Sequence, residues 1–241
     1  GNISPFNVEE PMLNVDLSLD SPIPKIINAI NKSPIKQVMK GLLDEMNGEG
    51  PGKLAVKLKI PLKDENNITF KGSYKFENSY LINNDLGMPK INNIVGYVEF
   101  DENDLLINDV KGSLSGSPIT IGLSNTGNTT HVDIIGIINK EFIQSTLGSH
   151  WASKFSGKAS WIGKIKMKDK ATSIKIESDL KGLGLSLPPP FDKKESDLTT
   201  LLLTTESINS DQEIISLKIG ASAFATLIKE NNYEGVFGIK K

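Results

Sequence analysis

The segment from Phe155 to Lys193 constrains the fold of this chain more than any other stretch. Small or apolar residues alternate there with lysine and serine, and the first apolar set is Ala159, Trp161, Gly163, Ile165 and Met167. Successive side chains on a strand point to opposite faces, so the pattern predicts one apolar face and one lysine-rich face. A second alternating run follows Asp169-Lys170, and a third holds Leu183, Leu185 and Leu187. Strand pairing must end at Pro188–Pro190, because proline has no N–H to donate.

Alternating runs of this kind recur along most of the chain. They cover 13–19, 54–60, 68–76, 94–100, 105–110, 118–123, 132–138, 198–205, 214–219, 221–228 and 236–239. An acidic turn, Asp101 to Asp104, separates two of them as in a β-hairpin. Since short polar turns rather than helical crossovers join the runs, the sheet is predicted to be largely antiparallel.

One part of the chain has a helical period instead. A short helix is predicted at 24–30, and Ser33 and Pro34 suit the cap and first position of a second helix. In this second helix the apolar residues, at three- and four-residue spacing, are Ile35, Val38, Met39, Leu42, Leu43 and Met46, and Gly48 is the predicted stop. The sequence therefore predicts a single domain over residues 1–241, with a helical insert at about 24–47 that packs on the sheet.

Composition excludes several classes of function. The net charge is −2 and all 27 basic residues are lysines, so the chain has no bidentate arginine clamp for phosphate and no global field that would recruit nucleic acid. There is no cysteine, which excludes disulfides, thiol catalysis and thiolate metal sites. No apolar run approaches the length of about 18 residues that a membrane helix needs, so we expect none of these segments to span a membrane as a helix.

Residues that could carry chemistry are sparse. His131 and His150 are the only histidines and belong to no metal-ligand motif, so we expect surface or capping roles for them. The cluster Asp101, Glu102 and Asp104 lacks the glycine and closing glutamate of a calcium loop. Gly50–Lys53 resembles a phosphate loop only in part, because the leading glycine and the following Ser/Thr are missing. The sequence therefore predicts no enzyme activity, no metal and no cofactor.

The predicted apolar face is too large for its predicted cover. About ten strands make a sheet roughly 45 Å wide, whereas a helix is about 10 Å across. A soluble monomer does not leave such a face in water. The sheet could close on itself as a sandwich or barrel, pair with another copy or a neighbouring segment, or hold an apolar ligand, and these alternatives stay open on the residues alone.

The same central segment carries a family resemblance. Its residues are Ser156, Gly157, Trp161 and Gly163, followed by Ser178, Asp179, Leu180, Gly182, Leu183, Leu185, Leu187, Pro188, Pro190, Phe191 and Lys193. This pattern resembles the YhdP family of large AsmA-like proteins of Gram-negative bacteria. Ser21-Pro22, the helical stretch after it and the run ending at Leu62 are similar to the family as well.

The resemblance implies a large curved, twisted antiparallel sheet that forms an open groove or partial barrel, with one or two packing helices. It also implies a periplasmic segment, tethered to the inner membrane by a region outside this chain, that conducts phospholipid between the inner and outer membranes. The expected partners are phospholipid acyl chains and flanking segments of the same long chain, without nucleic acid. The candidate lipid-binding residues are Leu54, Val56, Leu58, Ile68, Phe70, Tyr74, Ile119, Ile121, Ile174, Ile176, Leu183, Leu185 and Leu187. The alternative is a non-catalytic structural or interaction module whose sheet is fully covered by protein.

Overall fold

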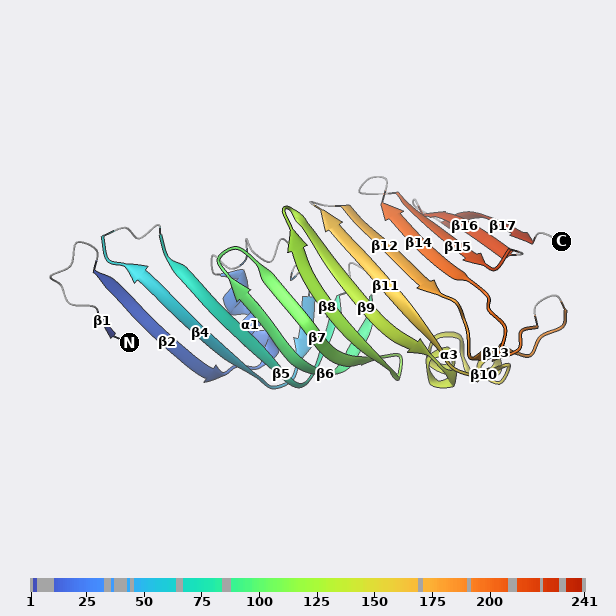
Figure 1. Ribbon diagram of the computed structural model, residues 1–241, viewed down its shortest axis with the longest axis horizontal. Coiled ribbons are helices and arrows are strands. Elements are labelled where there is room, and N and C mark those ends of the chain that lie inside the picture. Colours follow the sequence, from blue (N-terminus) through green and yellow to red (C-terminus); the bar gives the residue numbers. More distant parts are fainter. Residues whose placement is uncertain are drawn as a thin grey trace. The chain divides into compact units, whose positions relative to one another are not determined.

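The computed structural model describes residues 2–3, 11–32, 36, 43, 46–63, 67–83, 88–168, 171–189, 192–207, 212–221, 223–229 and 233–239. Within them the chain is mainly β, with antiparallel strands and three short helices (Figure 1). Contacts divide the chain into two compact units. Unit 1 holds residues 1–112 and 123–125, and unit 2 holds 113–122 and 126–241. The expectation of one domain over residues 1–241 stays a prediction.

Unit 1 is an antiparallel meander with one helix. Its elements are β1 (Asn2–Ile3), β2 (Met12–Asp20), α1 (Ile23–Asn31), β3 (Met46–Glu49), β4 (Gly52–Pro61), β5 (Thr69–Asn83), β6 (Met88–Asp101) and β7 (Leu105–Leu114). The strand order is β1-β2-β4-β5-β6-β7, and β3 pairs with β5 outside this path. The predicted acidic hairpin is confirmed, because the Asp101 carboxylate accepts from the backbone N–H groups of Asn103 and Asp104 and ties the turn.

The helical insert is confirmed only in its first part. Helix α1 covers the predicted short helix, has proline in its first turn and buries Ile23, Ile26 and Ile30. The second predicted helix falls largely outside the described residues. Its predicted end is wrong, because Met46 and Gly48 lie in strand β3. Strand β5 is 15 residues long, and its last residues extend beyond its pairing with β4. Strand β3 pairs with this last part, Tyr80 to Asn83, and provides the backbone hydrogen-bond partners that β4 does not.

Unit 2 is a second antiparallel meander, with a small separate sheet. Its elements are β8 (Ser117–Thr126), β9 (Thr129–Ile138), α3 (Lys140–Leu147), α4 (Ser149–Ala152), β10 (Phe155–Gly157), β11 (Ala159–Lys168), β12 (Ala171–Ser178), β13 (Leu183–Leu185), β14 (Leu201–Ser207), β15 (Glu213–Ile219), β16 (Ala223–Lys229) and β17 (Tyr233–Ile239). The order is β8-β9-β11-β12-β14-β15-β16-β17, and β10 pairs only with β13. Figure 1 shows β10, β13 and α3 together at one end of β9 and β11.

The third alternating run does not join the large sheet as predicted. Leu183–Leu185 pairs with β10, and the neighbour of β12 is β14. The backbone turns away after β12, because Leu180 and Gly182 adopt positive φ angles of 50° and 89°. Glycine tolerates such angles, whereas leucine is strained there, so tertiary contacts must hold this turn.

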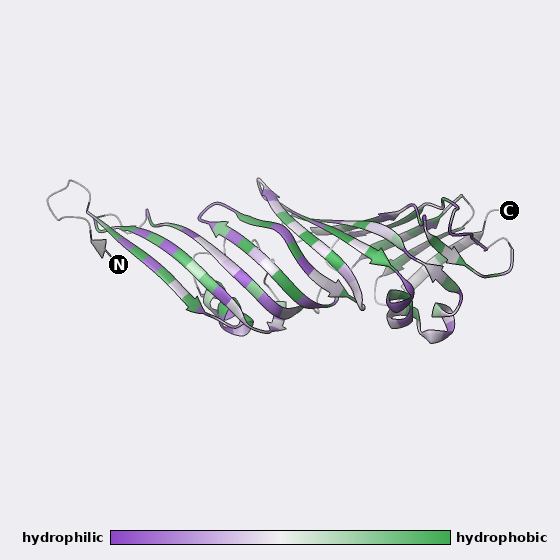
Figure 2. Cartoon of the chain, turned by 60° about the horizontal axis from the view of Figure 1, so that its bottom comes forward, coloured by the Kyte–Doolittle hydropathy of each residue, from purple (hydrophilic) through white to green (hydrophobic). Residues whose placement is uncertain are grey.

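In neither unit does the strand order return to its first strand, so each sheet is open. Residues of apolar and polar character alternate along the strands, as the green and purple bands of Figure 2 show. The predicted fold class, mainly β with open antiparallel sheet and short helices, is therefore confirmed.

Candidate functional site: two apolar sheet faces

The apolar face of unit 1 is built from cross-strand partners on β2, β4, β5 and β6. Leu58 of β4 faces Val15 and Phe70, and Val56 faces Leu17 and Gly72. The phenyl ring of Phe100 lies over Gly72, where an added Cβ would approach it to 2.4 Å. Register therefore places the apolar side chains of neighbouring strands together on one face.

Helix α1 covers one end of this face. Tyr74 points from β5 on the same face, and its hydroxyl donates a 2.7 Å hydrogen bond to the carbonyl of Ser21, just before α1. Burial, and secondarily the charge of Glu77, raises the pKa of Tyr74 to about 12. The phenol is therefore a neutral donor, and protein covers Tyr74 itself.

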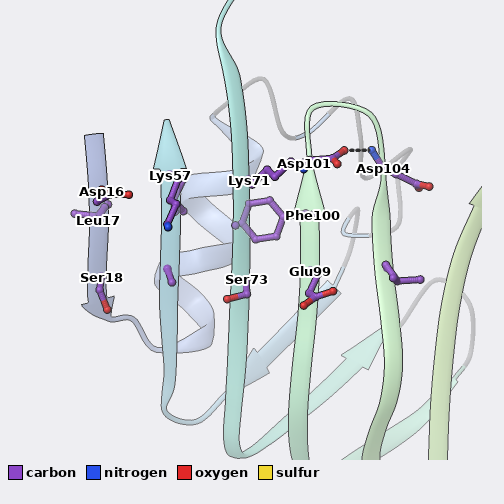
Figure 3. Close-up of a pocket in the computed structure, with 14 residues that line it drawn as sticks. Asp16, Leu17, Ser18, Lys57, Lys71, Ser73, Glu99, Phe100, Asp101 and Asp104 are labelled. Atoms are coloured by element: carbon purple, nitrogen blue, oxygen red, sulfur yellow. Dashed lines mark hydrogen bonds between the residues drawn. The ribbon is translucent and has the colours of Figure 1, made fainter. Parts of the chain in front are cut away.

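The β2 edge of this face and the residue just before β5 are less covered. Leu17 and Leu19 of β2 are 44% and 37% exposed, and Ile68 is 41% exposed. A pocket of about 810 Å³ lies along the middle of β2, β4, β5 and β6 and is drawn in Figure 3. Most of its lining belongs to the polar face of these strands, where Asp16, Lys57, Lys71 and Asp101 are cross-strand partners in one row, and Leu17, Val56 and Phe100 of the apolar face contribute as well. The volume lies in the range of small-molecule sites.

Unit 2 presents the larger apolar surface, which we call the apolar strip. It comprises one face of β9, β11, β12, β14 and β15. Its central row, in cross-strand order, is Ile134, Gly163, Ile176, Leu203 and Leu217. A flanking row holds Val132, Ile165, Ile174, Thr205 and Ile215 in the same way, and the row on the other side includes Gly136, Trp161, Ser178, Leu201 and Ile219. The side chains on β12, β14 and β15 in the central row are only half-buried.

The largest side chain of the strip lies flat on the sheet. An added Cβ on Gly136 would come within 2.4–2.5 Å of the Trp161 indole, and one on Gly163 within 2.9 Å. Trp161 is 6% exposed, and its Nε1 has no hydrogen-bond partner in the described part of the chain. The two glycines thus provide room for the indole to lie against the strand backbone, so Trp161 does not project far from the sheet.

One edge of the strip ends at a wall of leucine side chains. Leu180 and Leu183 form a buried cluster with Ala159, against which Ile138, Phe155 and Leu201 pack. Ala159 and Ile138 are cross-strand partners on the same face as Trp161. We call Leu180 and Leu183 the leucine wall.

Lys193 holds the leucine wall in place. Its ammonium group donates to the carbonyl oxygens of Leu180 and Leu183, at 2.7 Å each, and of Lys194 at 3.1 Å. Lys193 also pairs through its backbone with Leu185, at 2.8 and 2.9 Å. We call this arrangement the Lys193 clasp.

Close backbone contacts complete the clasp. A Cβ on Gly157 would lie 2.1 Å from the carbonyl oxygen of Gly182, and one on Gly182 would lie 2.5 Å from that of Lys158. Ser178 donates to the carbonyl of Ser160 and accepts from the N–H of Leu180. Most of the described residues that carry the family resemblance therefore build this clasp and wall.

The structure brings some predicted lipid-binding residues together and separates others. Leu54 faces Tyr74, and Leu58 faces Phe70, on the apolar face of unit 1. Ile68 lies just before β5 and is exposed. In unit 2, Ile174 and Ile176 lie in the apolar strip, and Ile119 and Ile121 lie on β8. Leu183 and Leu185 belong to the small sheet, Leu183 within the wall, and Leu187 follows them outside any strand.

Several residues of the apolar surfaces were not among the predicted ones. They are Val15, Leu17 and Leu19 on β2, and Leu201, Leu203, Ile215 and Leu217 on β14 and β15. Their alternation is visible in the sequence, and cross-strand register adds them to the two faces.

No group of three or more acidic or histidine side chains that could hold a metal ion occurs among the described residues. His150 lies in the short helix α4 and is exposed, and His131 lies on β9 opposite Lys166. Within the same residues no helix is long and apolar enough to cross a bilayer. The arrangement offers apolar surface rather than reactive groups.

Comparison with known proteins gave one match. A family model described as YhdP protein matches residues 1–241. Neither the curated proteins nor the solved structures gave a match.

Proposed function

The chain belongs to the YhdP family, and from this membership we propose that it is a segment of a periplasmic AsmA-like conduit that carries phospholipid between the inner and outer membranes. Flanking segments of the same long chain would continue the conduit, and a region outside these residues would tether it to the inner membrane. The segment would act by binding and not by catalysis. Acyl chains would be held by burial of apolar surface, which needs no specific hydrogen bonds.

The observation that carries this proposal is the apolar strip of unit 2. Ile176, Leu203 and Leu217 follow one another across three strands, yet each stays half-buried. A folded protein gains by covering contiguous apolar surface of this kind, so an apolar ligand is a natural cover. The opposite face of β11 carries Lys164, Lys166 and Lys168, with Ile162 as the apolar exception, and on β12 Lys175 pairs with Glu177 at 2.8 Å. The opposite face of these two strands is therefore more polar than the apolar strip, which supports lipid binding on the strip.

The second candidate is a structural or interaction module whose sheet is covered by protein. The observation that favours it lies in unit 1, where α1 covers the apolar face around Tyr74. Under this alternative, flanking protein would cover the strip of unit 2 in the same way.

Lipid retained by the purified chain distinguishes these candidates. Native mass spectrometry would measure phospholipid bound to the wild type, before and after incubation with vesicles of phosphatidylethanolamine and phosphatidylglycerol. Leu203→Asp places a charge in the central row and should abolish binding, because an unpaired charge in an apolar site is costly. Leu202→Asp is the matched control, since Leu202 is also half-buried and is the preceding residue on the opposite face of β14.

Circular dichroism would verify that both variants remain folded. Retention of lipid by the wild type and Leu202→Asp, with loss in Leu203→Asp, supports the conduit. A folded wild type that carries no lipid and takes up none from vesicles, or equal binding by both variants, would refute it in favour of the covered module.

A further inference from the structure

Lysines face one another across two neighbouring strands on the polar face of unit 1. Lys57 of β4 is the direct cross-strand partner of Lys71 of β5, and Lys53 is the partner of Lys75 in the same way. Like charges directly opposite each other on a sheet are unfavourable, so a negative charge beside either pair stabilises it. Glu77 supplies this charge for one pair, since its carboxylate lies 2.9 Å from the ammonium group of Lys75 and 3.9 Å from that of Lys53.

The other pair has no acidic partner of this kind. None of the ion pairs within the described ranges involves Lys57 or Lys71, and both residues are exposed. Asp16 of β2 is next to Lys57 in the same row, and Asp101 of β6 is next to Lys71. One oxygen of Asp101 already accepts hydrogen bonds from the backbone of its turn. The row therefore has the charge order negative, positive, positive, negative, with two adjacent lysines at its centre.

The surface beside this row is hollow. The lining of the pocket of about 810 Å³ includes the four charged residues of the row and the next row on the same face, which is Ser18, Ala55, Ser73 and Glu99 (Figure 3). Three of these last four side chains are small, so a ligand can approach the sheet between the longer side chains. The two serine hydroxyl groups add hydrogen-bond donors beside the lysine pair.

We propose that this hollow binds a small zwitterion of the phosphoethanolamine class, which carries a phosphate and a primary ammonium group joined by two carbons. Lys57 and Lys71 bind the phosphate as point charges, and the exposed carboxylate of Asp16 binds the ammonium group. Neighbouring strands are about 4.8 Å apart, and a two-carbon link spans a similar distance between the two charges. A ligand that carries only phosphate brings a like charge close to Asp16, so it binds more weakly.

Titration of the isotope-labelled chain, followed by NMR at low ionic strength, tests the site, because salt screens exposed charges. The probes are O-phosphoethanolamine, inorganic phosphate and ethanolamine. We expect O-phosphoethanolamine to shift the amide signals of β4 and β5 around Lys57 and Lys71. It should bind about fivefold more tightly than either other probe, as one additional exposed charge pair allows. Equal affinity for O-phosphoethanolamine and inorganic phosphate, or shifts confined to other strands, would overturn the proposal.

Two variants and a matched control assign the contacts. Lys57→Gln should weaken binding of O-phosphoethanolamine about fivefold. Asp16→Asn should bind inorganic phosphate at least as tightly as the wild type and lose the preference for O-phosphoethanolamine. Lys166→Gln removes the same charge from an exposed position on β11 and should change neither affinity. Equal weakening by Lys57→Gln and Lys166→Gln in folded protein would indicate unspecific attraction and contradict the site.

Cosedimentation with vesicles identifies the source of the ligand. Vesicles of phosphatidylethanolamine in phosphatidylcholine are compared with vesicles of phosphatidylcholine alone, whose quaternary ammonium group has no N–H to donate to Asp16. Sedimentation with the first vesicles only, lost in Lys57→Gln, assigns the ligand to a lipid headgroup. Binding of O-phosphoethanolamine without sedimentation assigns it to a free solute, and both results support the site. Lipid on the apolar strip is measured separately by native mass spectrometry, so failure of this site leaves the proposed function standing.

Discussion

Replacement of Lys193 by methionine tests the clasp. Methionine keeps an unbranched apolar stem but removes the ammonium group, which donates to Leu180, Leu183 and Lys194. The two bonds to Leu180 and Leu183 are part-buried, whereas the exposed third carbonyl can bind water instead. Hydrogen bonds from charged groups contribute about 1.5–3 kcal/mol each, and the low end for two of them gives about 3 kcal/mol.

Urea unfolding followed by circular dichroism measures this loss. We expect a lower midpoint with an unchanged slope, because the surface exposed on unfolding stays the same. Lys194→Met is the matched control, since Lys194 is the exposed neighbour and should change stability by less than about 0.5 kcal/mol. A loss below about 0.5 kcal/mol for Lys193→Met as well would show that water replaces the ammonium group, and the reasoning from the clasp would fail.

Three further predictions concern packing, ionisation and chemistry. Gly136→Ala should lower the free energy of unfolding by about 1–3 kcal/mol, because the new Cβ would overlap the Trp161 indole. In a Trp161→Leu background the same substitution should hardly change the unfolding midpoint. Because the pKa of Tyr74 is raised to about 12 in the folded state, the protonated phenol stabilises the fold fully below pH 10. This contribution should disappear as the pH rises from 10 to about 12. The unfolding midpoint of Tyr74→Phe should therefore fall less over that interval than the midpoint of the wild type. Esterase, phosphatase and nuclease assays should give only background rates, and an activity that survives purification but disappears in His131→Ala or His150→Ala would contradict this.

Much of the fold follows from local pattern. The alternation of side chains along a strand is a property of two-residue steps, so runs such as Leu54 to Ile60 identify strand β4 without tertiary information. The acidic turn at Asp101 is also predictable from the sequence, because an aspartate carboxylate accepts hydrogen bonds from the backbone N–H groups of a tight turn. The same periodicity predicted which face of β11 is apolar, and the structure buries Ala159, Trp161 and Ile165 on that face.

The remaining features depend on contacts between distant residues. Leu183 and Leu185 alternate as a sheet strand would, but the turn at Leu180 and the ammonium of Lys193 redirect them onto the end of β11. Met46 fits a helical period, and pairing with Asn83 nevertheless places it in a strand. The candidate site could be predicted only in part. Alternation shows that a residue lies on an apolar face, but contacts between distant residues decide what covers that face.

The meander order of the two units has a consequence for how the chain acquires its structure. In unit 1 each of β5, β6 and β7 is next to the strand that precedes it, and among the described strands of unit 2 only the segments between β9 and β11 and between β12 and β14 interrupt this order. Loops that join such neighbours close at low entropic cost, so assembly can proceed strand by strand from the N-terminus. The two interrupting segments contain the residues of the clasp and are the longest closures of unit 2, so they are candidates for the slowest steps in the assembly of that unit.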